Sequence, residues 1–450
     1  MPDRRVLVVG TTPDYIAYID KHYPGRALFL TDTIHRTGIS ETVPDASSEI
    51  VTHLSDSSNV PDTIENHLKA KRQSLSGVVC YDCEWLILAA TLAEHFDLSF
   101  PSVESVRLSR DKYLSKIRWL EKGIRCPRVE LINNAWQVSG LTERIGGSVV
   151  LKPLTGSGSE LTFLCHDNYD SAITFRAIRE GLLWRSDNPL YKTNHTNEQK
   201  AIEPVVLAEE FFEGREYSAD FIIADTGIQL IRVAKKLRDE SLPFGTTAAY
   251  VVPAKLPEGI NHDELAAKLF NAAEALGLDN AVCMADFIIN KNDIVILELT
   301  PRIGGDCLPP LIRHCCGLDT IGLAFDLAEG RRISIPSREK WRVMVGLRLF
   351  ASDNGTLRKI DCTALNDDPR VKEIYLKRIP GHEIALPPDD YDSRILGHVI
   401  FEPHPDQQIS LQCDQIKEKI SIIVEQYHDQ ELLRFNNEIR RIAQAPDPQA

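Results

Sequence analysis

Residues 282–307 have the sequence VCMADFIINKNDIVILELTPRIGGDC, and this stretch decides the fold at the centre of the chain. Two apolar runs flank the polar segment 290–293, a pattern typical of a β-hairpin. Asp286 interrupts the first run and Glu298 interrupts the second. A carboxylate inside an apolar strand costs free energy unless it is paired or bound to a cation. Two such carboxylates in one hairpin therefore indicate a metal site.

The spacing of these two acids predicts an irregularity in the hairpin. Alternation along the second strand puts every second residue on one face: Ile294, Ile296, Glu298 and Thr300. A loop with an even number of residues, such as 290–293, would leave Asp286 and Glu298 on opposite faces, so we predict an odd loop or a β-bulge. Two carboxylates and the hydroxyl of Thr300 are hard oxygen ligands, suited to Mg²⁺ that is shared with phosphates. The metal interpretation therefore depends on a phosphate site elsewhere in the chain.

The composition excludes several classes of protein. The chain has 450 residues, 43% of them hydrophobic and 26% charged, as in a soluble globular protein of two to four structural units. Its net charge of −14 argues against general nucleic-acid binding. No run of 18 apolar residues suggests a membrane span, and the N-terminus lacks the pattern of a signal peptide. We therefore expect a cytoplasmic protein.

Ten cysteines are scattered along the chain. Cys80 and Cys83 form a CxxC pair, but no second pair or histidine follows at zinc spacing. We expect reduced, partly buried thiols, although the role of this pair stays open.

The first hundred residues alternate between strand and helix patterns. Apolar runs at 5–10, 27–31 and 76–81 predict strands, 84–96 predicts a helix, and the Ser-rich, acidic segment 40–60 predicts a loop. This order predicts an open, doubly wound α/β sheet. The turn after Gly10 is not GxGxxG, so nothing supports a dinucleotide site.

The middle of the chain mixes α and β patterns after Pro101. Ser109 and Gly123 are the expected cap and stop of a helix over 110–122, whose apolar face would hold Tyr113, Leu114, Ile117 and Leu120. A second helix is expected over 262–276, and 185–200 has no period and predicts a loop. The expected strands are 148–153, 161–165, 204–212, 216–224 and 228–234. Beyond Pro336 we expect short strands over 341–402, helices near 412–427 and 429–444, and a disordered tail.

Several polar groups precede the hairpin. The loop 154–160, with Thr155, Gly156, Ser157 and Gly158, has small residues that let a backbone approach phosphate oxygens, and Lys152 at the end of an apolar strand calls for an anion. Taken alone, a Gly/Ser loop between two strands is more often an ordinary hairpin. Lys112, in the first turn of its helix, is a phosphate ligand or a surface lysine. The segment Glu209-Glu210-Phe211-Phe212 is a hinge for a flat base or an acidic edge strand, and Glu216 beyond it lies within reach of a sugar hydroxyl.

Taken in order, these segments resemble the ATP-grasp superfamily. The resemblance rests on Lys112 within RDK…KGIRCP, on VVLKPLTGSGS, on LAEEFFEGREYSADF, and on Asp286 followed by ELTPRIGG. It covers roughly residues 100–335. Residues 1–99 resemble the preATP-grasp domain, and the segment after 343 resembles the C-terminal domain that biotin carboxylases share with amino-acid ligases. Residues 235–257 resemble the substrate-side loop of those carboxylate–amine ligases.

The resemblance implies roles for individual residues. Lys112, Lys152 and the 154–160 lid would contact ATP phosphates. Glu209 through Phe212 would hold adenine, mainly by backbone groups, and Glu216 would hold ribose. Asp286 and Glu298 would bind Mg²⁺ or Mn²⁺, and Arg302 would stabilise the transferred phosphoryl group or a substrate carboxylate. Thr300 departs from the family pattern, since an asparagine usually supplies the third metal ligand.

The resemblance implies three domains: preATP-grasp over 1–100, ATP-grasp over 101–336 with a lid subdomain about 148–212, and a mixed α+β domain over 337–450. The implied activity is an ATP-dependent carboxylate–amine ligase that forms an amide through an acyl phosphate, with amino acids as substrates. Specificity would depend on residues around 235–252 and 303–314, and a homodimer is compatible with the resemblance. Two alternatives stay open: a biotin carboxylase-type enzyme that phosphorylates bicarbonate, and an ATP-binding regulatory module without turnover.

Overall fold

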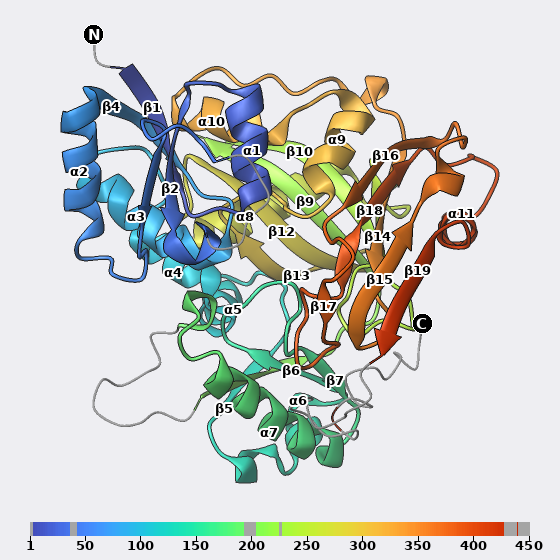
Figure 1. Cartoon of the computed structure of the whole chain (residues 1–450). Coiled ribbons are helices and arrows are strands. Elements are labelled where there is room, and N and C mark those ends of the chain that lie inside the picture. Colours follow the sequence, from blue (N-terminus) through green and yellow to red (C-terminus); the bar gives the residue numbers. More distant parts are fainter. Residues whose placement is uncertain (1–2, 37–42, 193–203, 225–226, 427–438, 440–450) are drawn as a thin grey trace.

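The computed structural model describes residues 3–36, 43–192, 204–224, 227–426 and 439 (Figure 1). The N-terminal part is a parallel sheet of four strands in the order β3-β2-β1-β4, as the strand–helix alternation predicts. Its strands are β1 (Asp3–Val9), β2 (Ala27–Asp32), β3 (Glu49–Thr52) and β4 (Gln73–Val79). The expectation of a loop throughout 40–60 was wrong, because Ile50 is buried against the neighbouring strand β2 and Glu49 accepts a hydrogen bond from Thr31 at 2.5 Å.

Helices cover both faces of this sheet. One face packs on α2 (Val60–Lys71), α3 (Leu86–His95) and α4 (Val103–Arg110). The other face packs on α1 (Pro13–His22) and on α10 (Thr320–Ala328), which comes from the middle of the chain. Contacts of α10 with β4 join the N-terminal sheet to the rest of the molecule.

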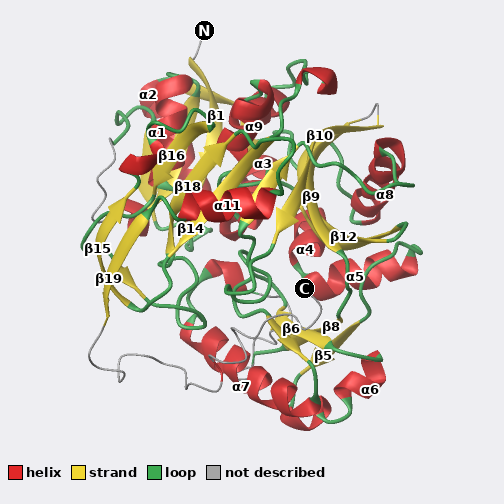
Figure 2. Cartoon of the chain, turned by 90° about the vertical axis from the view of Figure 1, so that its right-hand side faces the viewer, coloured by secondary structure: helices red, strands yellow, loops and turns green. Residues whose placement is uncertain are grey.

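A small antiparallel sheet forms a separate lobe at the bottom of Figure 1, with the strand order β5-β8-β6-β7. Its strands are β5 (Val129–Ile132), β6 (Val149–Pro153), β7 (Phe163–Cys165) and β8 (Val206–Glu210). The helices α6 (Leu141–Ile145) and α7 (Asn168–Trp184) cover its face away from the other sheets (Figure 2). The expected strands 148–153, 161–165 and 204–212 correspond to β6, β7 and β8.

The large sheet has eight antiparallel strands in the order β13-β12-β9-β10-β11-β14-β18-β16. These are β9 (Arg215–Ala224), β10 (Gly227–Leu237), β11 (Ala249–Val252), β12 (Ala281–Asn290), β13 (Asp293–Thr300), β14 (Met344–Phe350), β16 (Val371–Leu376) and β18 (Ile395–Phe401). One face packs on α8 (His262–Ala275) and on Trp119 of α5 (Lys112–Glu121). The other face carries α9 (Leu308–Cys316) and α10 at one end, which leaves a cleft at the other.

The C-terminal part adds a three-stranded sheet, β17 (Glu383–Ile384), β15 (Gly355–Asp361) and β19 (Ser421–Gln426), with the helix α11 (Ile409–Lys417). The helix expected near 412–427 was therefore wrong in its second half, where β19 packs the half-buried Ile422 and Val424 on the core. The helix expected near 429–444 and the tail lie outside the described residues, except for residue 439. Because the large sheet takes strands from both sides of residue 336, the three-domain division remains a proposal about folding units.

Short 3₁₀ helices complete the fold at Thr33–Arg36, Cys83–Trp85, Ala135–Val138, Pro189–Tyr191, Arg338–Lys340 and Thr363–Leu365. Of the loop expected at 185–200, residues 193–200 lie outside the described part. All ten cysteines are free and nine of them are buried, in agreement with the expectation of reduced, partly buried thiols. No helix among the described residues is long and apolar enough to cross a membrane.

Candidate active site

The hairpin β12–β13 contains the predicted irregularity. Its turn is the two-residue pair Lys291-Asn292, an even loop, and Asn290 pairs with Asp293. The register then shifts after Phe287, which pairs with Ile296, so that Asp286 pairs with Glu298 and Leu297 is left as an extra residue. The prediction of a bulge is therefore confirmed, and it brings both carboxylates to one face.

The bulge also corrects the facing that strict alternation predicts. Ile294 and Ile296 are each only 1% exposed and belong to the core beneath the sheet, together with Phe287. Glu298 and Thr300 line the cleft on the opposite face. The single extra residue at 297 reverses the alternation between these two pairs, so the expectation that all four share a face was wrong.

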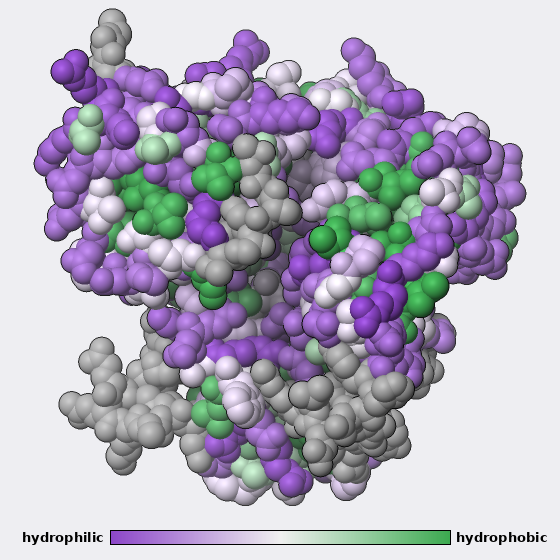
Figure 3. Space-filling model, viewed as in Figure 1, coloured by the Kyte–Doolittle hydropathy of each residue, from purple (hydrophilic) through white to green (hydrophobic). Residues whose placement is uncertain are grey.

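The cleft lies between the small sheet and the large sheet and encloses a cavity of about 320 Å³. The surface between the lower lobe and the upper part of the molecule is mainly hydrophilic (Figure 3). Every predicted site residue lines this cavity: Lys112, Lys152, Thr155, Gly156, Ser157, Gly158, Glu209, Glu210, Phe211, Phe212, Glu216, Asp286, Glu298, Thr300 and Arg302. Tertiary structure thus brings all of them together.

Lys112 reaches the cleft because a helix begins at its position. The carboxylate of Asp111 accepts hydrogen bonds from the backbone N–H groups of residues 113 and 114, each at 3.0 Å, and so caps α5. Ser109 lies in the last turn of the preceding helix α4 instead, so the expected cap was wrong. The Lys112 ammonium lies 3.4 Å from Glu298 and donates to the carbonyl of Gly156 at 3.1 Å.

The buried face of α5 differs from the expected one. It consists of Lys112, Ser115, Lys116 and Trp119, whereas Leu120 is 43% exposed. The apolar residues gave a misleading signal, because this helix packs its polar side toward the cleft and only Trp119 into the core. Sequence reasoning missed Lys116 for the same reason, since a lysine normally marks a solvated face.

Glu209 links two of the lysines. Its carboxylate lies 2.6 Å from Lys116 and 2.6 Å from Lys152, and its side chain is 3% exposed. Burial alone would raise the pKa of Glu209, but the two ammonium groups outweigh burial and lower it. The Lys116 ammonium also donates to the carbonyl of Leu297, the bulged residue, at 2.8 Å. The Glu209 side chain therefore holds the lysines in place rather than facing the cleft as a free acid.

The rest of the hinge segment leaves its aromatic residues beside the cleft. Glu210 pairs with Arg128 at 3.0 Å, which turns its carboxylate to the rim. The guanidinium of Arg125 lies 5.0 Å from the ring centre of Phe212, a cation–π distance. Phe211 lies 6.2 Å from Phe244, which belongs to the loop that connects β10 and β11.

A second group of charges joins Glu216 to the hairpin. The ammonium of Lys236 contacts Glu216 and lies 3.4 Å from Asp286, and Arg238 lies 3.3 Å from Glu216. Burial alone would lower the pKa of Lys236, but the two carboxylates outweigh burial and raise it. Sequence reasoning gave Lys236 no role of its own and included it only in the segment that resembles a substrate-side loop.

The hairpin acids fit a divalent cation. Oδ1 of Asp286 is buried and has no hydrogen-bond partner among the described residues, and burial raises the pKa of this carboxyl group. A bound dication would reverse that effect and satisfy the free oxygen. The described residues contain no cluster of three or more acids, histidines or cysteines placed for a metal. Asp286 and Glu298 would therefore hold the ion together with Thr300 and phosphate oxygens.

The 154–160 loop closes over the cleft. The backbone N–H of Lys112 donates to the carbonyl of Leu154 at 2.9 Å. Gly156 and Gly158 have φ values of +142° and +66°, which favour glycine and expose backbone N–H groups. Ser159 donates to the carbonyl of Gly245 at 2.9 Å, so the loop also contacts the segment between β10 and β11. This loop therefore bridges the two walls of the cleft.

Arg302 lies where the N-terminal sheet meets the cleft. Its Nε donates to the sulfur of Cys83 at 3.1 Å, and its Nη1 donates to the carbonyl of Ile303 at 2.8 Å. Gly304 packs against the buried ion pair of Arg232 with Asp220, where a Cβ atom would lie 2.5 Å from Arg232 Nη2. The glycine therefore serves close packing, and the CxxC segment contributes Cys83 to the site wall.

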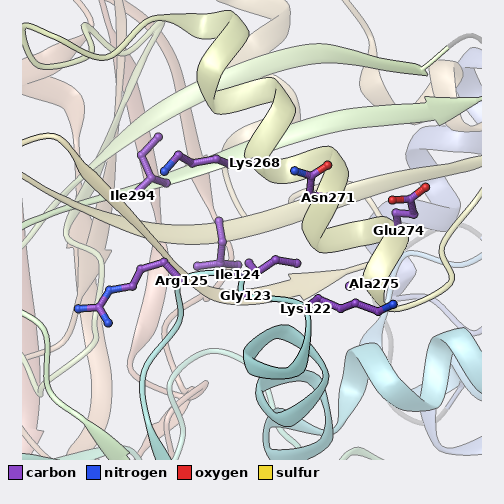
Figure 4. Close-up of a pocket in the computed structure, with 10 residues that line it drawn as sticks. Lys122, Gly123, Ile124, Arg125, Lys268, Asn271, Glu274, Ala275 and Ile294 are labelled. Carbon is purple, nitrogen blue, oxygen red and sulfur yellow. The ribbon is translucent and has the colours of Figure 1, made fainter.

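A different cavity, of about 590 Å³, lies on the other side of β13 (Figure 4). It is lined by Lys122 and Arg125 after α5, by Lys268 and Asn271 on α8, and by Ile294. None of the predicted site residues lines it. The chemistry that the sequence predicts therefore belongs to the cleft between the sheets.

Residues 145–310, which include the loop, the hinge and the hairpin, match the model of the ATP-grasp domain. The chain contains an ATP-grasp domain. Its computed structure is similar to the crystal structure of L-amino acid ligase from Bacillus licheniformis, with a TM-score of 0.74, 15% identity, and coverage of 94% of this chain and 100% of that one. The likeness shows that the two structures share one fold over nearly the whole chain, including the N-terminal sheet and the C-terminal part.

Curated proteins also match the ATP-grasp domain and its flanks. An uncharacterized protein of Sinorhizobium fredii is 25% identical over 73% of this chain and 64% of its own length. Carnosine synthase 1 of Homo sapiens is 23% identical over 75% of this chain and 41% of its own length. The matches thus span less than two thirds of the length of these relatives, which are distant ones.

Proposed function

We propose that the protein is an ATP-dependent carboxylate–amine ligase that joins amino acids through an amide bond. The observation that carries the proposal is the pairing of Asp286 with Glu298 across the bulge, with Oδ1 of Asp286 free and Lys112 at 3.4 Å from Glu298. Two acids and a cation at one point suit a metal ion that shares the phosphates of a nucleotide. The likeness to L-amino acid ligase and to carnosine synthase supports the amino-acid part of the proposal.

The proposed nucleotide site uses both sheets. Lys112, Lys152 and the backbone of 154–160 face the phosphates, Phe211 and Phe212 border the base, and Glu216 accepts hydrogen bonds from the ribose. Lys116 and Glu209 act through Lys152, which they position in the wall of the cleft. ATP would therefore lie between the sheets, under the loop that already contacts both walls.

The reaction follows from these positions. A substrate carboxylate oxygen attacks the γ-phosphorus of ATP, the bond to the β–γ bridging oxygen breaks, and an acyl phosphate and ADP form. A neutral amine then attacks the acyl carbon, the bond from that carbon to the phosphate oxygen breaks, and inorganic phosphate and one proton from the amine are released as the amide forms. Mg²⁺ held by Asp286 and Glu298 would neutralise phosphate charge. Lys112, Lys152 and Arg302 stabilise the charge on the transferred group, and the loop excludes water from the acyl phosphate.

The experiment that tests the proposal separates the two half-reactions. The protein is incubated with MgATP and single amino acids, with hydroxylamine as the trapping amine, and then with pairs of amino acids. We expect amino-acid-dependent ADP release, a hydroxamate in the trapping reaction, and a dipeptide with pairs. ADP release without a hydroxamate or amide from any carboxylate would overturn the proposal.

The two alternatives give different results in the same assay. A biotin carboxylase-type enzyme releases ADP only with bicarbonate and needs biotin for turnover. A regulatory module binds ATP but releases no ADP with any substrate, an outcome that the weaker ligand Thr300 would favour.

A further inference from the structure

Arg394 is a buried arginine that has no acidic partner within the described part of the chain. It lies directly before β18 and is 4% exposed. Its Nη2 donates to the hydroxyl of Thr246 at 2.8 Å, while its buried Nε has no hydrogen-bond partner among the residues that the structure describes. No carboxylate among the described residues lies within ion-pair distance of it. A buried guanidinium in this state costs free energy that a bound anion would offset.

A second arginine shares an aromatic ring with Arg394. The guanidinium centres of Arg348 and Arg394 lie 4.8 and 4.9 Å from the ring centre of Phe350. Arg348 pairs with Asp306 at 2.5 Å and donates to the carbonyl of Thr247 at 2.9 Å. Burial and the charge of Arg348 lower the pKa of Arg394 to about 10. The two cations are thus close together, but only one of them has a counter-charge.

Nearby acids are used elsewhere. Asp392 pairs with Lys377 at 2.6 Å and with Arg378 at 2.5 Å. Asp390 accepts hydrogen bonds from the backbone N–H groups of residues 392 and 393. Asp239 pairs with Lys417 at 2.5 Å. The surplus positive charge on Arg394 is therefore not cancelled by its surroundings.

Arg394 lines a cavity of about 340 Å³ beside the ATP cleft. The cavity lies between the segment that follows β10, the end of β14, and the C-terminal part with α11. Its walls are largely apolar and include Leu242, Pro243, Leu386, Pro387 and Ile420. Arg348 lines both this cavity and the ATP cleft, so the two spaces are neighbours.

We propose that this cavity is a binding site for a small monocarboxylate with an apolar body, whose carboxylate pairs with the free side of Arg394. A guanidinium forms two parallel hydrogen bonds to a planar carboxylate, and the single surplus charge matches a monoanion. The apolar walls accept a hydrocarbon portion and disfavour a strongly hydrated dianion such as phosphate. The site is separate from the nucleotide and metal groups and does not depend on the proposed ligase activity.

Calorimetric titration of the full chain with N-acetyl-L-leucine, in the presence of a non-hydrolysable ATP analogue, tests this site. We expect saturable binding that weakens about tenfold to a hundredfold when the carboxylate is replaced, as in N-acetyl-L-leucinamide, because a charge-assisted hydrogen bond is lost. Arg394→Gln should weaken the binding of N-acetyl-L-leucine to the same extent. It should leave the weak binding of N-acetyl-L-leucinamide unchanged. Arg358→Gln, an exposed arginine on the central strand β15 that pairs with Glu425, is the matched control and should bind as the wild type does.

The opposite results would contradict the proposed carboxylate site. These are equal binding of acid and amide by the wild-type protein, no loss in Arg394→Gln, or tighter binding of inorganic phosphate than of the carboxylate. If Arg394→Gln does not fold, Arg394→Lys is used instead. This variant keeps the positive charge but loses the two parallel hydrogen bonds of the guanidinium, and it should bind the acid with intermediate strength. The comparison of acid with amide in the wild type decides the question without any variant.

Discussion

Asp286 and Glu298 face each other across β12 and β13 because Leu297 is an extra residue in β13. The same residue supplies the carbonyl that accepts a hydrogen bond from Lys116 at 2.8 Å. One bulge therefore turns a carboxylate into the cleft and anchors a buried lysine beside it. A regular hairpin with this two-residue turn would have put Glu298 in the core.

Removing either carboxylate should abolish most turnover. We expect Asp286→Asn and Glu298→Gln to lower the rate of ADP release by about 10²–10³-fold, the scale seen when one preorganised charge-stabilising group is lost. Asp293→Asn is the matched control, since Asp293 lies on the same hairpin, is about half exposed and pairs with Arg125 at 3.2 Å. Near-normal ADP release in either cleft variant would refute the metal assignment.

The buried group of Lys116, Glu209 and Lys152 predicts unequal effects on stability. Glu209→Gln leaves two buried ammonium groups without an anion, and we expect it to cost about 3–5 kcal/mol in the free energy of unfolding. Lys116→Met keeps the pair of Glu209 with Lys152 and should cost distinctly less. Urea denaturation followed by circular dichroism measures both. If Lys116→Met proves as unstable as Glu209→Gln, the prediction that the two substitutions have unequal costs is wrong.

Thr300 should limit the affinity for metal. Thr300→Asn introduces a stronger oxygen ligand, and we expect it to lower the Mg²⁺ concentration needed for half-maximal ADP release. Thr300→Ala should raise that concentration about tenfold, the effect of one lost ligand contact of roughly 1.4 kcal/mol. Excess EDTA should stop ADP release in all three proteins. An unchanged Mg²⁺ dependence in both variants would remove Thr300 from the ligand set.

Asp82 predicts a pH dependence of stability. Burial, and then the charge of Glu84, raise its pKa to about 7, from 3.8. Between these values the folded protein binds one more proton than the unfolded chain. The protonated Asp82 therefore contributes to the free energy of unfolding fully below about pH 4, and this contribution is lost as the pH rises through about 7. Compared with Asp82→Asn, the wild type should therefore lose stability over this window and show a constant difference above it. Chemical denaturation at a series of pH values measures the difference, and a flat profile would contradict it.

Local patterns predicted much of the fold. Apolar runs gave β1, β2 and β4, as well as the strands of the small sheet, because a buried strand needs a continuous apolar stretch. The same reasoning failed for β3, which is short and contains Glu49. It also failed for β19, where a 3.6-residue pattern was assumed for an edge strand with every second residue exposed. Short strands at sheet edges carry too few residues for their period to be recognised.

The sequence by itself determined the central hairpin, its two acids and the need for an odd loop or a bulge, because side chains alternate with period two along any strand. It also determined that Lys112, Lys152 and the hinge precede that hairpin. Only the tertiary structure decided that the even turn is compensated at Leu297, that Lys236 lines the cleft, and that Glu209 pairs with the buried Lys116 and with Lys152. These contacts join residues as far apart as 181 positions, as between Lys116 and Leu297, and a pairing over such a distance leaves no local pattern in the chain.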